Sequence, residues 1–173
     1  MKKREPSSVR PLTSRVRSAL FSILGDKVKG KKVLDLFAGL GTFGLEALKR
    51  GAQSVTFVDI NSCMVRRIEG ELKKKQWEER SQVLRGDVSR IIPLLAKRKE
   101  TFDLIFIDPP YGKGLSKKVL SLPSLKEILL PSSLIILREF WRETTPPPEG
   151  FLLLQRRKYG EMVVSFLSLR NSF

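Results

Sequence analysis

The sequence predicts a single α/β domain, with helices on both faces of a mostly parallel β-sheet. Three observations predict this fold. Short apolar runs alternate with stretches of helical periodicity, a glycine-rich turn follows the first apolar run, and only Tyr159 and Gly160 separate the last two apolar runs. Alternating strands and helices are typical of βαβ units around a buried parallel sheet, whereas a two-residue connection indicates a hairpin of antiparallel strands.

The expected elements follow from local patterns along the chain. Apolar residues recur every four positions from Leu12 to Leu24, which predicts a first helix that ends at Gly25. Apolar runs predict strands at 33–37, 54–60, 82–88, 102–107, 134–140, 151–158 and 161–169. Helical periodicity predicts helices at 43–50, 63–79, 89–99 and within 117–130, with breaks at Pro123 and Pro131. We expect residues 11–173 to form one domain, preceded by a basic and flexible segment at 1–10.

The net charge indicates a polyanionic partner. The chain has 33 Lys and Arg against 18 Asp and Glu, a formal net charge of +15. An excess of this size repels itself in a compact fold and is typical of proteins that bind RNA, DNA or an anionic membrane surface. No apolar run approaches the roughly 18–20 residues of a spanning helix, and no apolar region follows the basic N-terminus as in a signal peptide. We therefore expect no membrane partner.

Two residue types restrict the chemistry. Cys63 is the only cysteine, which excludes intrachain disulfides and cysteine-based metal clusters and fits a reducing cytoplasm. The chain has no histidine. Ser-His-Asp and Cys-His catalysis, HExxH zinc sites and zinc-dependent deaminase sites are therefore excluded. We expect no metal, and a chemistry that uses carboxylates, amides, backbone groups, Tyr, Lys or Arg.

Residues 35–44, DLFAGLGTFG, lie where the first strand turns into a helix. Gly39 and Gly41 permit a tight turn and close approach of a ligand, and Gly44 permits close packing of the helix. Asp59 ends the next strand, where a carboxylate accepts hydrogen bonds from both hydroxyls of a ribose. This pattern fits NAD, S-adenosylmethionine or a turn without a ligand. Asp35 favours S-adenosylmethionine, because its carboxylate attracts an ammonium group and repels a pyrophosphate.

Asp87 follows Gly86 at the end of the third strand. In a doubly wound sheet this edge faces the ligand crevice, where the carboxylate would accept a hydrogen bond from an adenine amino group. The same side chain is also a suitable N-cap for the following helix. Both interpretations stay open, and they do not exclude each other.

Asp108, Pro109, Pro110 and Tyr111 follow the apolar strand at 102–107 and form the most informative motif. The two prolines restrict the backbone. The Asp108 carboxylate and the Pro109 carbonyl are placed to accept hydrogen bonds from one amino group, which directs the nitrogen lone pair out of the base plane. Tyr111 offers a ring on which a flipped base stacks. A proline turn with an aspartate cap is the alternative interpretation.

Together, these motifs resemble class I amino-methyltransferases. The N-terminal pattern from Arg10-Pro11 through Ile23-Leu24, the glycine turn, the motif at 108–111 and the late Tyr159-Gly160 pair are similar to the bacterial RsmD family, over about residues 10 to 170. That family usually has a short hairpin before the Arg-Pro pair, and nine residues precede Arg10 here. The resemblance implies a Rossmann-like seven-stranded sheet of order 3-2-1-4-5-7-6 with the last strand antiparallel. It implies methyl transfer from S-adenosylmethionine to the N2 amine of a guanine in 16S ribosomal RNA.

Site residues follow from the motifs and the resemblance together. The expected catalytic residues are Asp108, Pro109, Pro110 and Tyr111. The expected cofactor-binding residues are Asp35, Phe37, Gly39, Gly41, Asp59, Ile60, Asp87 and Val88. Two alternatives stay open: an amino-methyltransferase on another base, such as adenine N6 of DNA or RNA; and a non-catalytic module that binds RNA or the cofactor. The motif at 108–111 disfavours a nicotinamide enzyme, which has no use for it.

Basic residues are concentrated near the N-terminus, where residues 1–32 hold ten Lys and Arg against Glu5 and Asp26. We expect phosphate contacts there. The expected RNA-binding residues are Lys2, Lys3, Arg4, Arg10, Arg15 and Arg17. An alternative role for Arg10, Arg15 and Arg17 is to support the methionine end of the cofactor. The basic runs at 66–67, 73–75, 97–99 and 156–158 are interpreted as solvated faces. The expected partner is 16S ribosomal RNA or the small ribosomal subunit, bound by a cytoplasmic monomer.

Overall fold

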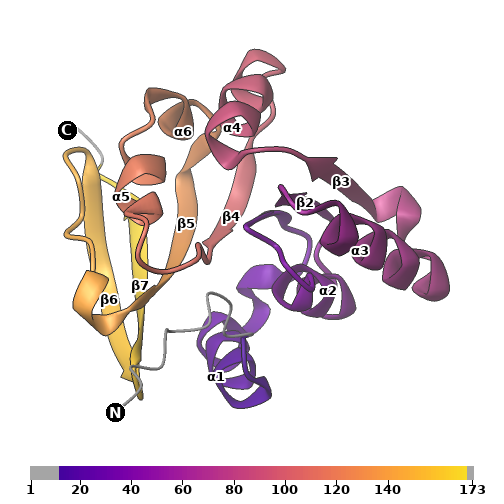
Figure 1. The fold of residues 1–173 in the computed structure, drawn as a ribbon, viewed down its shortest axis with the longest axis horizontal. Helices are drawn as coiled ribbons and strands as arrows, with labels where there is room; N and C mark the ends of the chain where they lie inside the picture. The colour runs from indigo at the N-terminus through magenta and orange to yellow at the C-terminus, as the bar shows by residue number, and fades with distance from the viewer. Residues whose placement is uncertain (1–11, 171–173) are drawn as a thin grey trace, which may run out of the picture.

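A computed structural model describes residues 12–170. The basic segment predicted at 1–10 lies outside these described residues, and Lys2, Lys3, Arg4 and Arg10 lie outside them with it. The described part of the chain contains a seven-stranded sheet of order β3-β2-β1-β4-β5-β7-β6 (Figure 1). This order confirms the predicted topology. The crossover between the two halves of the sheet lies between β1 and β4.

The strands are β1 (Lys32–Leu36), β2 (Ser54–Asp59), β3 (Ser81–Arg85), β4 (Phe102–Ile107), β5 (Leu129–Phe140), β6 (Phe151–Tyr159) and β7 (Met162–Leu169). Strands β1 to β5 pair in parallel, and β7 pairs antiparallel with both β5 and β6. The last strand is therefore the antiparallel one, as predicted. The turn between β6 and β7 consists of Gly160 and Glu161, and Gly160 has a φ of 61°.

The helices are α1 (Ser14–Leu24), α2 (Thr42–Lys49), α3 (Ser62–Lys75), α4 (Val88–Lys97), α5 (Leu115–Leu120) and α6 (Pro123–Glu127), with 3₁₀ turns η1 (Gly25–Val28), η2 (Glu78–Arg80) and η3 (Trp141–Glu143). They cover both faces of the sheet, as predicted (Figure 1). Apolar residues of α1, α2 and α3 share one core cluster with one face, and those of α4, α5 and α6 share a second cluster with the other. Alternating strand residues explain this division, because Val33 belongs to the first cluster and Leu34 to the second.

Several predicted boundaries were wrong, each for a local reason. Helix α3 ends at Lys75 rather than at 79, because Gln76 adopts a left-handed conformation with φ of 57°. Strand β3 ends at Arg85 rather than at 88, because Asp87 caps α4. The single helix expected within 117–130 is two short helices, and Pro123 is the first residue of the second. Proline is favoured at that position, where its missing N–H costs nothing.

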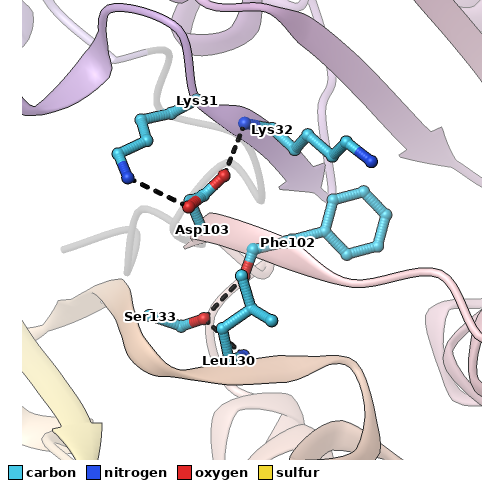
Figure 2. Close-up of polar contacts among 6 residues, drawn as sticks. All are labelled: Lys31, Lys32, Phe102, Asp103, Leu130 and Ser133. Carbon is cyan, nitrogen blue, oxygen red and sulfur yellow. Dashed lines mark hydrogen bonds and ion pairs between the residues drawn. The ribbon is translucent and has the colours of Figure 1, made fainter.

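Strand β5 begins at Leu129, five residues before its predicted start, and it contains Pro131. The register between β4 and β5 shifts between Phe102 and Leu104, so the proline lies in an irregular segment. Figure 2 shows how Ser133 spans this segment, because its hydroxyl accepts from Leu130 N at 2.7 Å and donates to Phe102 O at 2.6 Å. Pro131 therefore marks a bulge inside the strand and not its end.

The same end of the sheet is held by Asp103, the second residue of β4. Its carboxylate accepts from Lys32 N at 2.9 Å and pairs with Lys31 Nζ at 3.1 Å, which ties the start of β4 to the start of β1 (Figure 2). These contacts lie at the amino end of the parallel strands. The opposite, carboxyl end carries the motifs that the sequence singled out.

Candidate active site

Aspartates stand at or just beyond the carboxyl ends of four neighbouring strands. Asp35 lies in β1 and Asp59 ends β2, while Asp87 follows β3 and Asp108 follows β4. Because β3, β2, β1 and β4 are adjacent and parallel, these residues lie along one edge of the sheet. In open α/β sheets ligands bind at this edge, where the strand order reverses. We call these four residues the aspartate edge.

The glycine-rich turn between β1 and α2 is held by Asp35. Its side chain is buried, with 1% of the residue exposed, and it accepts from Gly44 N at 3.0 Å. Burial raises the pKa of the Asp35 carboxyl well above its ordinary value, and the Gly44 hydrogen bond opposes this effect. The predicted contact of Asp35 with a ligand's ammonium group stays a prediction. The structure adds a role that the motif did not indicate, which is to anchor α2 to β1.

The turn itself is compact. Gly39 and Gly41 have φ values of 54° and 69°, a region that favours glycine. A Cβ atom on Gly39 would meet nothing closer than Phe37 O at 4.0 Å, so the turn is open at that point. A Cβ atom on Gly44 would instead overlap the Phe57 ring of β2, which explains why the helix needs glycine there. Phe37 also has a positive φ of 60°, and such strained residues concentrate at functional sites.

Asp59 connects the glycine turn to the second strand. Its Oδ2 accepts from Gly39 N at 2.7 Å and its Oδ1 accepts from Asn61 N at 2.8 Å. An ionised carboxylate accepts about four hydrogen bonds, so these two contacts leave acceptor positions for a ribose. Ile60 follows with 65% of its surface exposed. An apolar side chain held open beside the turn is suited to pack against an adenine ring.

Asp87 caps α4, which settles one of its two interpretations. Its Oδ1 accepts from Ser89 N at 2.8 Å and from Ser89 Oγ at 2.6 Å. Hydrogen bonds from the Ser89 side chain and backbone lower the pKa of the Asp87 carboxyl. Contact with an adenine amino group stays a prediction. The Val88 side chain is buried in the second core cluster, so only its backbone is available to a ligand.

Asp108 is paired with Arg138, a residue of the neighbouring strand β5. Arg138 Nη1 donates to Oδ1 at 2.9 Å and to Oδ2 at 2.7 Å, and the side chains are only 3% and 17% exposed respectively. Burial raises the pKa of the Asp108 carboxyl to about 6, while the Arg138 charge and hydrogen bonds act in the opposite direction. At neutral pH the carboxylate is therefore mainly ionised and held in one orientation.

A cavity of about 270 Å³ lies beside the turn that follows Asp108, and its lining begins at Pro109. One wall includes Pro109, Pro110 and Tyr111. The other is formed by the end of β5 and the following loop, which contribute Glu139, Phe140, Glu143 and Thr145. The Tyr111 hydroxyl donates to Met162 Sδ at 3.2 Å, which fixes the ring. Glu143 accepts from Gly112 N at 2.8 and 2.9 Å and so joins the two walls.

The predicted catalytic residues thus lie together, but two charged neighbours were missed. Arg138 and Glu139 are 2% and 3% exposed, adjacent, and inside a strand that otherwise reads as apolar. Glu139 accepts from Thr145 N at 3.1 and 3.2 Å and from Thr145 Oγ1 at 2.6 Å. Buried charges are rare unless they are paired or functional. Two consecutive charges within the run 134–140 were the available signal.

The RNA-binding candidates are only partly placed. Arg15 is exposed and Arg17 half-buried on α1, and the remaining four candidates lie outside the described residues. Within residues 12–170, no group of three or more His, Cys, Asp or Glu side chains is arranged to hold a metal ion. No helix in the same range is long and apolar enough to cross a membrane.

The sheet order, the glycine turn after β1 and the motif after β4 define a class I methyltransferase domain. The chain matches the family described as "Conserved hypothetical protein 95" over residues 1–168. It belongs to this family, the RsmD family, which confirms the resemblance seen in the sequence.

Individual relatives agree with this assignment. The chain is 34% identical to the Bacillus subtilis protein named "Putative rRNA methyltransferase YlbH", over 89% of this chain and 84% of the relative. It is 29% identical to "Ribosomal RNA small subunit methyltransferase D" of Escherichia coli, over 95% and 81% of the two chains. A solved Streptococcus pyogenes structure titled as a conserved hypothetical protein superposes with a TM-score of 0.80 at 27% identity, over 90% of this chain and 96% of that one.

Replacing Arg138 with methionine should raise the pKa of Asp108 further above about 6. An opposite charge within about 4–6 Å typically lowers a carboxyl pKa by about 1 to 3, and this effect would be lost. The measurement is an NMR titration of the aspartate side-chain carboxyl carbons. Lys31→Met is the control, because it removes a pair with Asp103 at the other end of β4. An Asp108 pKa that stays the same or falls in Arg138→Met would contradict the assigned role.

Proposed function

We propose that this chain is an enzyme that transfers a methyl group from S-adenosylmethionine to the exocyclic N2 amine of a guanine in 16S ribosomal RNA. The observation that carries the proposal is the position of Asp108. It directly follows β4, which pairs with β1, the strand that leads into the glycine turn, and it directly precedes Pro109, which lines a cavity together with Tyr111 and Glu139. The names of the relatives support ribosomal RNA as the substrate class.

The cofactor site suits a cation. Asp35, Asp59 and Asp108 lie close enough that the charges on Asp108 and Asp59 each raise the pKa of Asp35. S-adenosylmethionine supplies a methyl group on a positively charged sulfonium and carries an ammonium group, both of which relieve this repulsion. Asp59 is the proposed acceptor for the ribose hydroxyls, and Ile60 the proposed contact of the adenine ring. The proposed set of cofactor-binding residues is completed by backbone groups of Phe37, Gly39, Gly41 and Val88. It also includes Asp87, through the carboxylate oxygen that does not bind Ser89.

Asp108 and the Pro109 carbonyl are the proposed acceptors for the two hydrogens of the target amine. Both prolines restrict the turn, so the acceptors need no reorganisation when the base arrives. Arg138 occupies one side of the carboxylate and leaves its remaining lone pairs for the amine. Holding both hydrogens out of the base plane would free the nitrogen lone pair to bond to the methyl carbon while the carbon–sulfur bond breaks and the neutral thioether, S-adenosylhomocysteine, leaves. The amine becomes acidic only after the transfer, and water or Asp108 then accepts the proton.

Glu139 favours guanine over adenine as the target base of the proposed site. It is a buried carboxylate in the wall of the cavity, and its present partners are the amide and hydroxyl of Thr145. The Watson–Crick edge of guanine presents two adjacent donors, N1–H and the N2 amine, whereas adenine presents one donor beside an acceptor. A carboxylate accepts from donors only. Tyr111 is the proposed stacking surface for the flipped base.

The remaining expectations belong to the same proposal. Residues 11–173 are proposed to act as one methyltransferase domain and as a monomer in the cytoplasm, with 16S ribosomal RNA or the small ribosomal subunit as partner and no metal. The basic segment at 1–10, together with Arg15 and Arg17, is proposed to contact phosphates. The formal net charge of +15 supports a polyanionic substrate.

Ile60→Ala should weaken S-adenosylmethionine binding by about 1.5 kcal/mol, because three carbon atoms worth about 0.8 kcal/mol each are lost from a side chain of which the ligand would cover the exposed 65%. The unfolding free energy should change by less than about 0.5 kcal/mol, because the side chain is 65% exposed without ligand. Calorimetric titration measures the first quantity and urea unfolding the second. Leu154→Ala, which alters a 54% exposed side chain on the far edge strand β6, is the control and should leave the affinity unchanged. Equal affinity of Ile60→Ala and wild type would remove Ile60 from the cofactor site.

Asp108→Ala should reduce methyl transfer to 16S ribosomal RNA by a factor of about 100 or more, the cost of losing one preorganised hydrogen-bonding group. Cofactor affinity should survive the change. Turnover is measured with labelled S-adenosylmethionine at saturating RNA. Asp103→Ala is the matched control on the same strand, since it removes an aspartate from the opposite end of β4. Near-normal turnover of Asp108→Ala would overturn the mechanism.

A further inference from the structure

An exposed tryptophan lies beside the proposed base cavity, and the proposed catalytic site does not involve it. Trp141 begins η3 directly after β5 and is 42% exposed. Two cations lie over its ring: Arg142 Cζ is 5.0 Å and Lys158 Nζ is 4.8 Å from the ring centre. Arg142 follows it in η3 and Lys158 comes from the edge strand β6, so two separate elements build the cluster. We call these three residues the aromatic–cation platform.

The platform is continuous with the catalytic turn through aromatic rings. The ring centres of Tyr111 and Phe140 are 6.0 Å apart, and those of Phe140 and Trp141 are 6.3 Å apart. Tyr111 and Phe140 both line the cavity, whereas Trp141 lies one ring further out. An aromatic path therefore leads from the proposed position of the target base to the surface.

The backbone that carries Trp141 is held in place. Trp141 N donates to Glu161 O at 2.9 Å, in the turn between β6 and β7. Thr144 Oγ1 donates to Trp141 O at 2.9 Å, and the following Thr145 is bound to Glu139 in the cavity wall. An exposed aromatic side chain on an ordered backbone binds a flat ligand at low entropic cost.

We propose that the aromatic–cation platform binds the nucleotide next to the target guanine in single-stranded RNA. This inference rests on the proposed function and extends it to a second nucleotide. A nucleotide offers a base with a π face and a phosphate with negative charge, and the platform offers an indole ring and two cations. The base displaces one cation from the ring, and that cation then binds the phosphate. Proteins that capture unstacked RNA bases combine aromatic stacking with basic side chains in this way.

The inference changes the interpretation of the basic run at 156–158. Arg156 is used within the protein, because its guanidinium donates to Ser165 Oγ at 2.9 Å and to Thr145 O at 3.1 Å. Lys158 instead extends over the exposed ring. The run is therefore divided between a residue that positions the loop and a residue that meets the ligand.

The two tryptophans of the chain, Trp77 and Trp141, make a direct test. Trp77 also has a cation over its ring, Lys75 Nζ at 5.3 Å, but it lies between α3 and η2, just before β3 in the chain. Strand β3 is the edge strand opposite β6 (Figure 1). Trp77→Phe leaves Trp141 as the reporter, and Trp141→Phe leaves Trp77. A short single-stranded RNA with a central guanosine is the probe, and anisotropy of labelled RNA follows binding independently. We expect saturable quenching in Trp77→Phe and none in Trp141→Phe. Unchanged Trp141 fluorescence while RNA is bound would overturn the inference.

Affinity and kinetics provide the second arm. Trp141→Ala should raise the Kd for the RNA at least about fivefold, the lower end for one stacked base, whereas Trp141→Phe should keep most of the affinity. Arg142→Ala with Lys158→Ala should reduce the slope of log Kd against log salt by about 0.7 for each lost phosphate contact. In methylation assays the KM for RNA should rise while kcat and cofactor affinity stay near wild type.

Wild-type affinity and KM in Trp141→Ala would exclude the platform. Absence of any RNA methylation by the wild type would instead defeat the proposed function, and the fluorescence result would still decide on the platform.

Discussion

The structure depends on the placement of four carboxylates along one edge of a parallel sheet. Four strands that run in the same direction bring Asp35, Asp59, Asp87 and Asp108 to a common edge. At Asp35, burial and the charges of Asp108 and Asp59 all oppose ionisation. Each carboxylate has a partner: backbone N–H groups of the following turns or helices bind the first three, and the Arg138 guanidinium binds the fourth. The same hydrogen bonds hold the turns that follow β1, β2 and β3, and they offset the cost of placing the carboxylates together.

This arrangement separates two kinds of charge. The chain carries a large positive excess, yet the edge proposed to hold the cofactor is lined by aspartates. In the proposed function, a cationic sulfonium cofactor is attracted to the aspartate edge, and a polyanionic RNA is attracted to the excess of basic residues. The proposal brings the two ligands together at the turn that contains Asp108. The aromatic path from Tyr111 through Phe140 leads from this turn to Trp141 and the two cations over its ring.

Much of the fold could be predicted from the sequence, because its strands are short apolar runs with clear interruptions. Strand β4 was predicted with the observed bounds, and the glycine turn and the motif at 108–111 were placed at strand ends before the sheet was known. The start of β5 was not predicted correctly, because Pro131 indicates a strand break. The Ser133 hydroxyl links Leu130 N to Phe102 O across this irregular segment, and the sequence does not reveal that contact. Arg138 was missed because its partner precedes it by 30 residues, and sequence patterns do not reveal which side chains meet across strands. The platform was missed for the same reason, because Lys158 of β6 meets Trp141 of η3 across 17 positions of the sequence.

The central claim is that the cavity beyond Asp108 receives a guanine of small-subunit ribosomal RNA and presents its N2 amine for methylation. The most direct measurement is mass spectrometry of nucleosides from unmodified 16S ribosomal RNA, or small subunits, incubated with this protein and isotopically labelled S-adenosylmethionine. The account predicts label in N2-methylguanosine at one position. Label in N6-methyladenosine, or in no nucleoside when both free RNA and subunits are supplied, would contradict it.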